Sequence, residues 1–210
     1  SAPLPKHLIF VIGMSGVAAQ KTGGARESYN RAAALSGTLL EVWRETSGRT
    51  DATLFEAVTS SPDAYPRLRG ALGAMTAGPA RPADLEARLD QFVDESLVLI
   101  PADFDALASG DLSAFGRAVD RSQRGAETLL GNQIPETKDL SRLARSLGAH
   151  AASAFGAGFG GSVWALVSRP GAEAFRADWE REYRRRHDRP AATFFATEAG
   201  PALVRIVAHQ

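Results

Sequence analysis

The chain has 210 residues, of which 44% are hydrophobic and 23% are charged, and its formal net charge at pH 7 is zero. This is the composition of an ordinary globular protein, and a chain without net charge has no overall field that would attract nucleic acid or an anionic membrane. The sequence contains no cysteine, which excludes disulfides and thiolate metal sites and is typical of a cytoplasmic protein.

The N-terminal run from Leu8 to Ile12 is continuously apolar and predicts a strand that is covered on both faces. It is too short to cross a bilayer, and no signal-peptide cleavage pattern follows it, so we expect no membrane contact. No strand-like run precedes it in this chain. We therefore expect it to pair with a segment outside the chain, and its exposed edge to allow self-association.

Helical periodicity dominates the middle of the chain. The pattern predicts a helix over residues 25–44, one that begins at Ser61 and Pro62, one from Pro82 that Pro101 ends, one capped by Asp111, and a short one over 137–147 that Gly148 ends. The apolar stripes of these helices are typical of a core and do not indicate a cofactor site.

Strands return after Gly148. Residues 150–155 and 162–167 predict a hairpin, a helix follows around Phe175 to Arg186, and residues 193–197 and 203–207 predict two more strands. This order indicates an α+β fold in which helices pack on one face of an antiparallel sheet.

The hairpin contains the stretch "AFGAGFGGSVW", residues 154–164, with the pattern G-x-G-x-x-G in Gly156, Gly158 and Gly161. A dinucleotide fingerprint must lie between a strand and a helix, whereas a strand both enters and leaves this stretch. A Walker-type loop is excluded because Ser162 stands where its lysine should be. Two interpretations remain: a turn that needs positive φ, or a loop whose backbone N–H groups cradle an anion.

Residues 147–167, "LGAHAASAFGAGFGGSVWALV", resemble the third motif of the galactokinase, homoserine, mevalonate and phosphomevalonate (GHMP) kinase family, in its galactokinase form. The matching positions are Gly156, Gly158, Phe159, Gly160 and Gly161, and Ala157 replaces a glycine. Ser153 and Phe155 stand where the motif usually has Arg and Thr. The resemblance implies that residues 156–161 support the phosphate-binding loop of a kinase.

Residues 10–32 are similar to a second galactokinase segment, in which a strand is followed by Y-N-x-R at the start of a helix. Here the sequence reads Tyr29-Asn30-Arg31, so the arginine comes one position early. The resemblance implies that Tyr29 contacts the sugar substrate. The alternative is that Tyr29 is only the first core residue of its helix.

Together the two stretches imply the C-terminal domain of a GHMP kinase, with a ferredoxin-like core. Residues 1–20 would form a strand and loop that join a missing N-terminal kinase domain, and residues 21–210 would form the C-terminal domain. The complete protein would use ATP and Mg²⁺ to phosphorylate a galactose-like monosaccharide.

The ATP-phosphate loop, catalytic aspartate and Mg²⁺ ligand of the family would lie upstream of this chain. We therefore assign no catalytic and no metal-binding residue within it, and we expect the chain alone to be inactive and to hold no cofactor. Two alternatives stay open: a non-catalytic binding or regulatory module with the same fold, and a kinase assembled from two chains.

Overall fold

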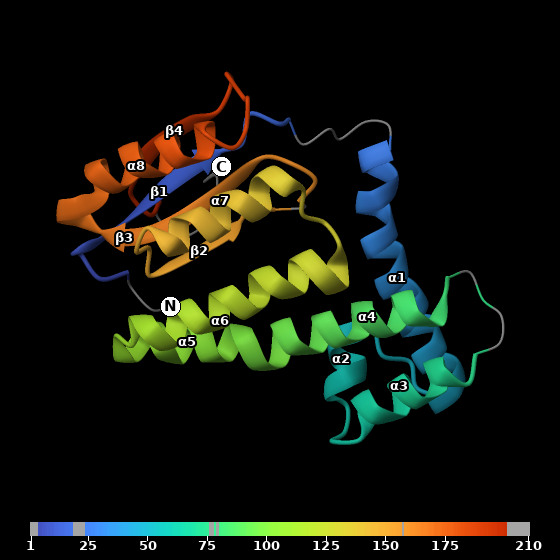
Figure 1. The fold of residues 1–210 in the computed structure, drawn as a ribbon. Helices are drawn as coiled ribbons and strands as arrows, with labels where there is room; N and C mark the ends of the chain where they lie inside the picture. The colour runs from blue at the N-terminus through green and yellow to red at the C-terminus, as the bar shows by residue number, and fades with distance from the viewer. Residues whose placement is uncertain (1–3, 19–23, 76–77, 79, 157, 201–210) are drawn as a thin grey trace, which may run out of the picture.

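The computed structural model describes residues 4–18, 24–75, 78, 80–156 and 158–200, with the backbone alone for residues 24–29. It contains a four-stranded antiparallel sheet, which lies at the upper left in Figure 1. The strands are β1 (Leu8–Met14), β2 (Ala151–Ala154), β3 (Ser162–Ser168) and β4 (Thr193–Thr197), in the spatial order β2-β3-β1-β4. This order is that of a ferredoxin-like sheet, and it confirms the expected α+β class.

The first strand does not have the expected partner. β1 lies inside the sheet, where Leu8 pairs with Ser168 of β3 and Phe10 pairs with Thr197 of β4. Both of its hydrogen-bonding edges are therefore occupied within this chain. The expectations that β1 pairs with a missing half, and that its exposed edge allows self-association, are both wrong. The partners were missed because they follow β1 by about 150 residues or more.

Two helices cover one face of the sheet, as expected. They are α7 (Pro135–Ser146) and α8 (Ala172–Arg184). Val11, Val163 and Ala165 point from the strands into the core that these helices close. Trp179 of α8 is fully buried there, and its indole Nε1 donates a hydrogen bond to the Leu140 carbonyl of α7 at 3.0 Å.

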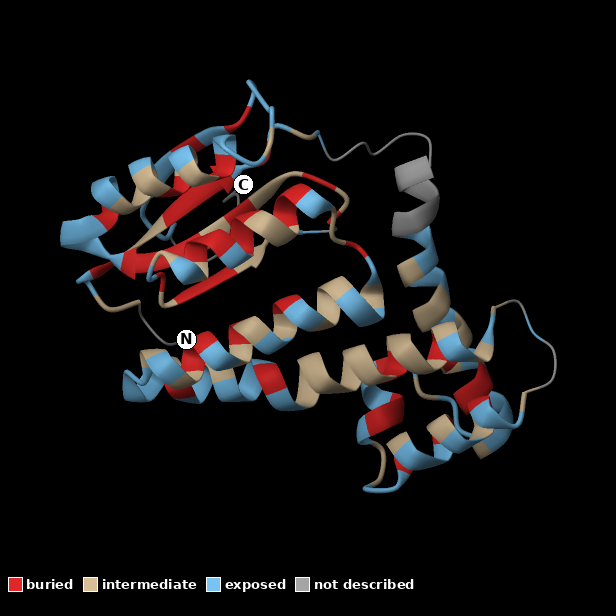
Figure 2. Cartoon of the chain, viewed as in Figure 1, coloured by how far each residue is buried: buried red, intermediate tan, exposed pale blue. Residues whose placement is uncertain are grey.

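A second pair of helices contacts the opposite face near β2 and β3, so helices pack on both faces of the sheet and not, as the sequence had indicated, on one face alone. These are α5 (Ile100–Ser109) and α6 (Leu112–Gly125), which follow each other as an antiparallel pair (Figure 1). The alternate residues of the strands supply this core: Leu8 and Leu166 pack with Phe115 and Val119 of α6. The sheet therefore contributes to two cores, and its buried residues form the band of red that Figure 2 shows between the helices.

The remaining helices form a third core beside the sheet (Figure 1). They are α1 (Gly24–Ser47), α2 (Leu54–Thr59), α3 (Ala64–Gly73) and α4 (Pro82–Val93). Their fully buried side chains include Leu39, Leu68 and Leu85. The helical pattern predicted neither α2, which Thr53 and Glu56 open with a capping box, nor the start of α3 at Ala64.

Pro101 does not end the fourth helix. A π-helical turn, η1 (Asp94–Leu99), joins α4 directly to α5, and in it the Ile100 N–H donates to Glu95, five residues back. A proline inside a regular α-helix loses a hydrogen bond and collides with a carbonyl one turn earlier. The wider turn changes that geometry, so the helical path continues to Ser109. A second π-helical turn, η2 (Ala126–Leu130), similarly extends α6.

Several local predictions are confirmed. Asp111 caps α6, since its carboxylate accepts a hydrogen bond from the Ala114 N–H at 2.8 Å. Gly148, with a φ of +95°, follows the end of α7. A 3₁₀ turn, η3 (Arg169–Gly171), leads from β3 into α8. The strand predicted over residues 203–207 lies outside the described residues. In the described part of the chain, no helix has the length and apolarity needed to cross a membrane.

Candidate functional site

The glycine-rich stretch forms the connection between β2 and β3. The Phe155 N–H donates to the Ser162 carbonyl at 2.9 Å and closes the base of this loop, residues 155–161. The φ angles are positive at all four glycines: +61° at Gly156, +82° at Gly158, +131° at Gly160 and +87° at Gly161. The expectation of positive φ is therefore confirmed. Glycine suits these positions because few other residues adopt this conformation without strain. Ala157, which replaces a glycine of the family motif, lies outside the described residues.

Phe159 is the exception inside the loop. Its φ of +60° is unusual for an aromatic residue, and among the described residues it is the one non-glycine with positive φ. Its N–H donates to the Asn132 carbonyl at 2.6 Å. A conformation of this kind persists where the surrounding structure enforces it, so the loop is held from outside.

One anchor is the end of β1. The Ser15 N–H donates to the Gly161 carbonyl and the Gly161 N–H donates to the Val17 carbonyl, both at 2.9 Å. The Ser15 carbonyl in turn accepts a hydrogen bond from the Tyr183 hydroxyl at 2.8 Å. Burial raises the pKa of Tyr183 to about 12, so the hydroxyl keeps its proton and remains a donor at neutral pH.

The second anchor is Asn132, which follows η2 and is buried. A Cβ at Gly158 would lie 2.0 Å from the Asn132 carbonyl oxygen, which is far inside van der Waals contact. Gly158 is therefore required twice, for its positive φ and for this close approach of two backbones. The sequence predicted the first requirement. It carried no signal for the second, because the contact joins two loops that are distant along the chain.

A third contact holds the strand that enters the loop. The side-chain carbonyl of Gln123, a buried residue of α6, accepts hydrogen bonds at 3.0 Å from the Ser153 hydroxyl and from the Ala154 N–H. Ser153, which departs from the family motif, is thus bound within the chain. Phe155, the other departure, is exposed. Gln123 was not predicted, since an isolated glutamine in an amphipathic helix resembles any surface residue.

The loop adjoins the beginning of α1 across a cavity of about 290 Å³. Phe159 of the loop and Gly131, which follows η2, line it on one side, and Arg31, Ala32 and Leu35 line it from α1. The structure therefore brings together the two stretches that resemble the family, although they are distant in sequence. The side chain of Tyr29 lies outside the described residues, but its backbone occupies the first turns of α1, two residues before Arg31.

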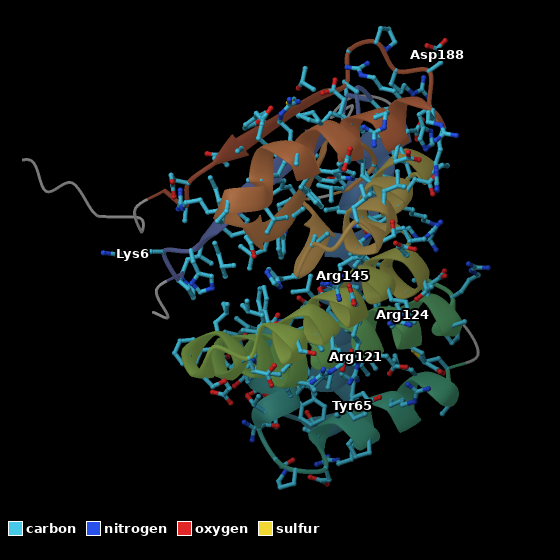
Figure 3. All side chains as sticks on the ribbon, turned by 60° about the vertical axis from the view of Figure 1, so that its left-hand side comes forward. Lys6, Tyr65, Arg121, Arg124, Arg145 and Asp188 are labelled. Atoms are coloured by element: carbon cyan, nitrogen blue, oxygen red, sulfur yellow. The ribbon has the colours of Figure 1, made fainter. Side chains whose placement is uncertain are left out.

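A second cavity, of about 340 Å³, lies between α6, α7 and β2. Most of its charged lining is paired within the cavity: Arg145 makes two hydrogen bonds to Asp120, at 2.8 and 2.9 Å, and Arg142 lies 4.0 Å from Glu127. Arg124 is the remaining charged residue of the lining. Figure 3 shows Arg145 where α7 and the sheet meet α6. The pair of Arg145 and Asp120 joins α7 to α6, so we assign this cluster a structural role. Within the described residues, no three histidine or carboxylate side chains gather in the way that a metal ion needs.

Comparison with known proteins agrees with this arrangement. The family described as GHMP kinases C terminal matches residues 103–185. A galactokinase of Roseiflexus sp. (strain RS-1) is 31% identical over 129 residues, which are 60% of this chain and 32% of that protein. The crystal structure of Lactococcus lactis galactokinase complexed with galactose has a TM-score of 0.75 and 22% identity, and the match covers 95% of this chain and 47% of that chain.

The chain thus spans less than half the length of these two relatives. The Lactococcus match establishes the fold, the Roseiflexus match relates the sequence to a galactokinase, and the family match covers α5 to α8 with the glycine-rich loop between them. Residues 103–185 therefore match the GHMP kinase C-terminal family, and 95% of the chain shares the fold of part of the Lactococcus galactokinase.

Proposed function

We propose that this chain is the C-terminal half of a sugar kinase that transfers the γ-phosphate of ATP to the anomeric hydroxyl of a galactose-like monosaccharide. The observation that carries the proposal is the meeting of the glycine-rich loop and the first turns of α1 around one cavity. These are the two stretches that resemble galactokinases, and the fold joins them although the chain separates them by more than 100 residues.

The proposal divides the work between this chain and an N-terminal kinase domain, joined through residues 1–20 or supplied as a second chain. Phosphoryl transfer depends on positioning and on neutralising charge, mostly by a phosphate loop, a base and Mg²⁺. In our proposal those groups belong to the N-terminal domain. This chain, in residues 21–210, supplies the glycine-rich loop that supports the phosphate loop, and Tyr29, whose hydroxyl and ring face a sugar can use. The cysteine-free sequence is consistent with a reaction in the cytoplasm.

The test is sugar-dependent ADP release by the full-length protein that contains this chain, with galactose as the first substrate. Tyr29→Phe should raise the KM for the sugar severalfold and leave the KM for ATP nearly unchanged. Tyr65→Phe is the matched control. Tyr65 lies in α3, in the helical group formed by α1 to α4 (Figure 3), and its hydroxyl donates a hydrogen bond to Asp90 at 2.8 Å. Gly158→Val should reduce kcat/KM for ATP strongly.

Three results would contradict the proposal. A full-length protein that binds sugar or ATP without releasing ADP would be a non-catalytic module with this fold. An unchanged sugar KM in Tyr29→Phe would make that tyrosine a core residue. Sugar-dependent ADP release by the pure 210-residue chain would show that the division of labour is wrong.

A further inference from the structure

The cavity beside the glycine-rich loop carries an excess of positive charge. Its charged lining consists of Arg31 from α1, Arg81 just before α4, and Asp84 and Arg88 within α4. Asp84 already holds two of the arginines, since Arg31 lies 2.6 Å and Arg81 lies 2.8 Å from its carboxylate. The lining therefore has three guanidinium groups and one carboxylate, which leaves two positive charges uncompensated within it.

Arg88 is the arginine of the cavity lining that is not paired with Asp84. Its guanidinium donates to the side-chain carbonyl of Gln91 and, at 3.4 Å, to the Ala32 backbone carbonyl, and it lies 5.5 Å from the centre of the Phe92 ring. Among the described residues it forms no ion pair. Burial lowers the pKa of Arg88, which reflects the cost of removing a charge from water without an opposite charge nearby. An anion in the cavity would remove that cost.

The rest of the wall is apolar. Leu35, Leu129 and Leu130 line the cavity together with Phe159, and Leu129 remains 40% exposed. A ligand that used the whole space would therefore present an anionic group to α4 and an uncharged, partly apolar body to the loop. Guanidinium groups favour phosphate because they match its geometry with paired hydrogen bonds.

From this arrangement we infer that the cavity between α1, α4 and Phe159 binds a phosphorylated small molecule, with Arg88 as the principal anion-binding residue and Asp84 as a competitor for Arg31 and Arg81. The inference concerns the same cavity as the proposed function, but it can hold or fail separately, because it is about binding to this chain and not about phosphoryl transfer. A bound phosphate would take over the two arginines that Asp84 now holds, so the cavity contains its own internal counterion.

The test is isothermal titration of the 210-residue chain with phenyl phosphate, an anion with an apolar body. Inorganic phosphate and phenol serve as the separate halves of that probe. We expect saturable binding of phenyl phosphate, binding of inorganic phosphate that is about tenfold weaker, and no binding of phenol. Binding should weaken as the salt concentration rises, because part of the interaction is electrostatic.

Three variants give three different expectations for the binding of phenyl phosphate. Arg88→Gln should weaken phenyl phosphate binding at least tenfold, whereas Asp84→Asn should strengthen it severalfold by releasing two arginines. Arg181→Gln, on the surface of α8 and paired with Asp178 at 2.6 Å, is the control and should change nothing. Thermal melting of each variant checks that it is folded. Absence of saturable binding, equal binding by Arg88→Gln, or weaker binding by folded Asp84→Asn would each overturn the inference.

Discussion

Gly158 and Gly156 have the same backbone requirement but different surroundings. Both have positive φ, so an added Cβ strains either position by about 1 kcal/mol. At Gly156 no atom lies within 4 Å of the new Cβ, whereas at Gly158 the Asn132 carbonyl oxygen would be 2.0 Å away. The pair therefore separates the cost of the conformation from the cost of the contact.

We expect Gly156→Ala to lower the free energy of unfolding by about 1 kcal/mol and Gly158→Ala by about 2–4 kcal/mol, because the second variant must also push the loop away from Asn132. Urea unfolding of the two variants measures the difference. Equal losses would mean that the Asn132 contact is easily displaced, and that the loop is held mainly by its pairing with Ser15 and Val17.

Asp103 of α5 gives the protein a specific dependence on pH. One of its carboxylate oxygens is buried without a hydrogen-bond partner among the described residues. Burial, together with the nearby charge of Glu95, raises the pKa of Asp103 to about 6. Because the folded protein favours the protonated form, the stabilising contribution of this group is complete below about pH 4 and is lost as the pH rises through 6.

Asp103→Asn should therefore stabilise the chain at pH 7.5, by about 1 kcal/mol after allowance for partial exposure, and the gain should shrink as the pH falls from 6 to 4. Thermal unfolding at several pH values measures this. The exposed Asp105, two residues later, supplies the control variant Asp105→Asn. A gain that did not vary with pH would show that the effect does not come from titration of Asp103.

At the scale of elements, α6 touches the start of β2 so closely that only glycine fits between them. A Cβ on Gly116 would lie 2.2 Å from the His150 carbonyl oxygen and 3.1 Å from the Arg145 guanidinium, which itself hydrogen-bonds that carbonyl at 2.6 Å. Gly125, at the end of the same helix, has open space and would meet only the Gln91 side chain, at 3.8 Å.

The two glycines of α6 should therefore respond in opposite directions. Gly116→Ala should destabilise the chain by about 2–4 kcal/mol, because α6 must move off the sheet. Gly125→Ala should stabilise it by up to about 1 kcal/mol, because alanine favours a helix and meets no obstacle. Guanidinium unfolding gives both values. If Gly116→Ala were neutral, α6 would not be fixed against β2 through this contact.

The sequence predicted those features of the fold that depend on neighbouring residues. Asp111 and Gly148 mark helix ends through a hydrogen bond and a backbone angle that involve only nearby residues. The four glycines of the glycine-rich loop likewise indicated its positive φ angles. The prediction that Pro101 ends a helix was wrong, because a π-helical turn just before it lets the helical path continue. Gln123 and Asn132 were missed since their roles depend on partners from other elements, which periodicity alone does not reveal.

At the scale of the molecule, one helical path connects separate cores. Leu85 and Leu89 of α4 belong to the core of the helical group, while Ala106 of α5 belongs to the core beneath the sheet. The π-helical turn η1 joins the two without a loop. We therefore expect the helical group and the sheet to unfold together, although their cores do not share side chains.

Leu68→Ala tests this expectation, because Leu68 is fully buried in the helical group. The cavity should cost about 2–5 kcal/mol. Native-state hydrogen exchange should then show the same loss of protection in β1 and β3 as in α3, since all three open in one event. A loss confined to α1–α4 would instead make the helical group an independent unit.

The central position of β1 has a consequence for how the chain is made. Met14 pairs with Ser162 and Phe10 pairs with Thr197, so β1 leaves the ribosome well before the strands with which it pairs. At roughly 5–20 residues per second, the intervening segment of about 150 residues takes on the order of 10–30 s to synthesise. During that time an apolar strand has no partner of its own. The long closure needed for pairing slows folding further, so we expect the nascent chain, more than the finished protein, to need chaperones.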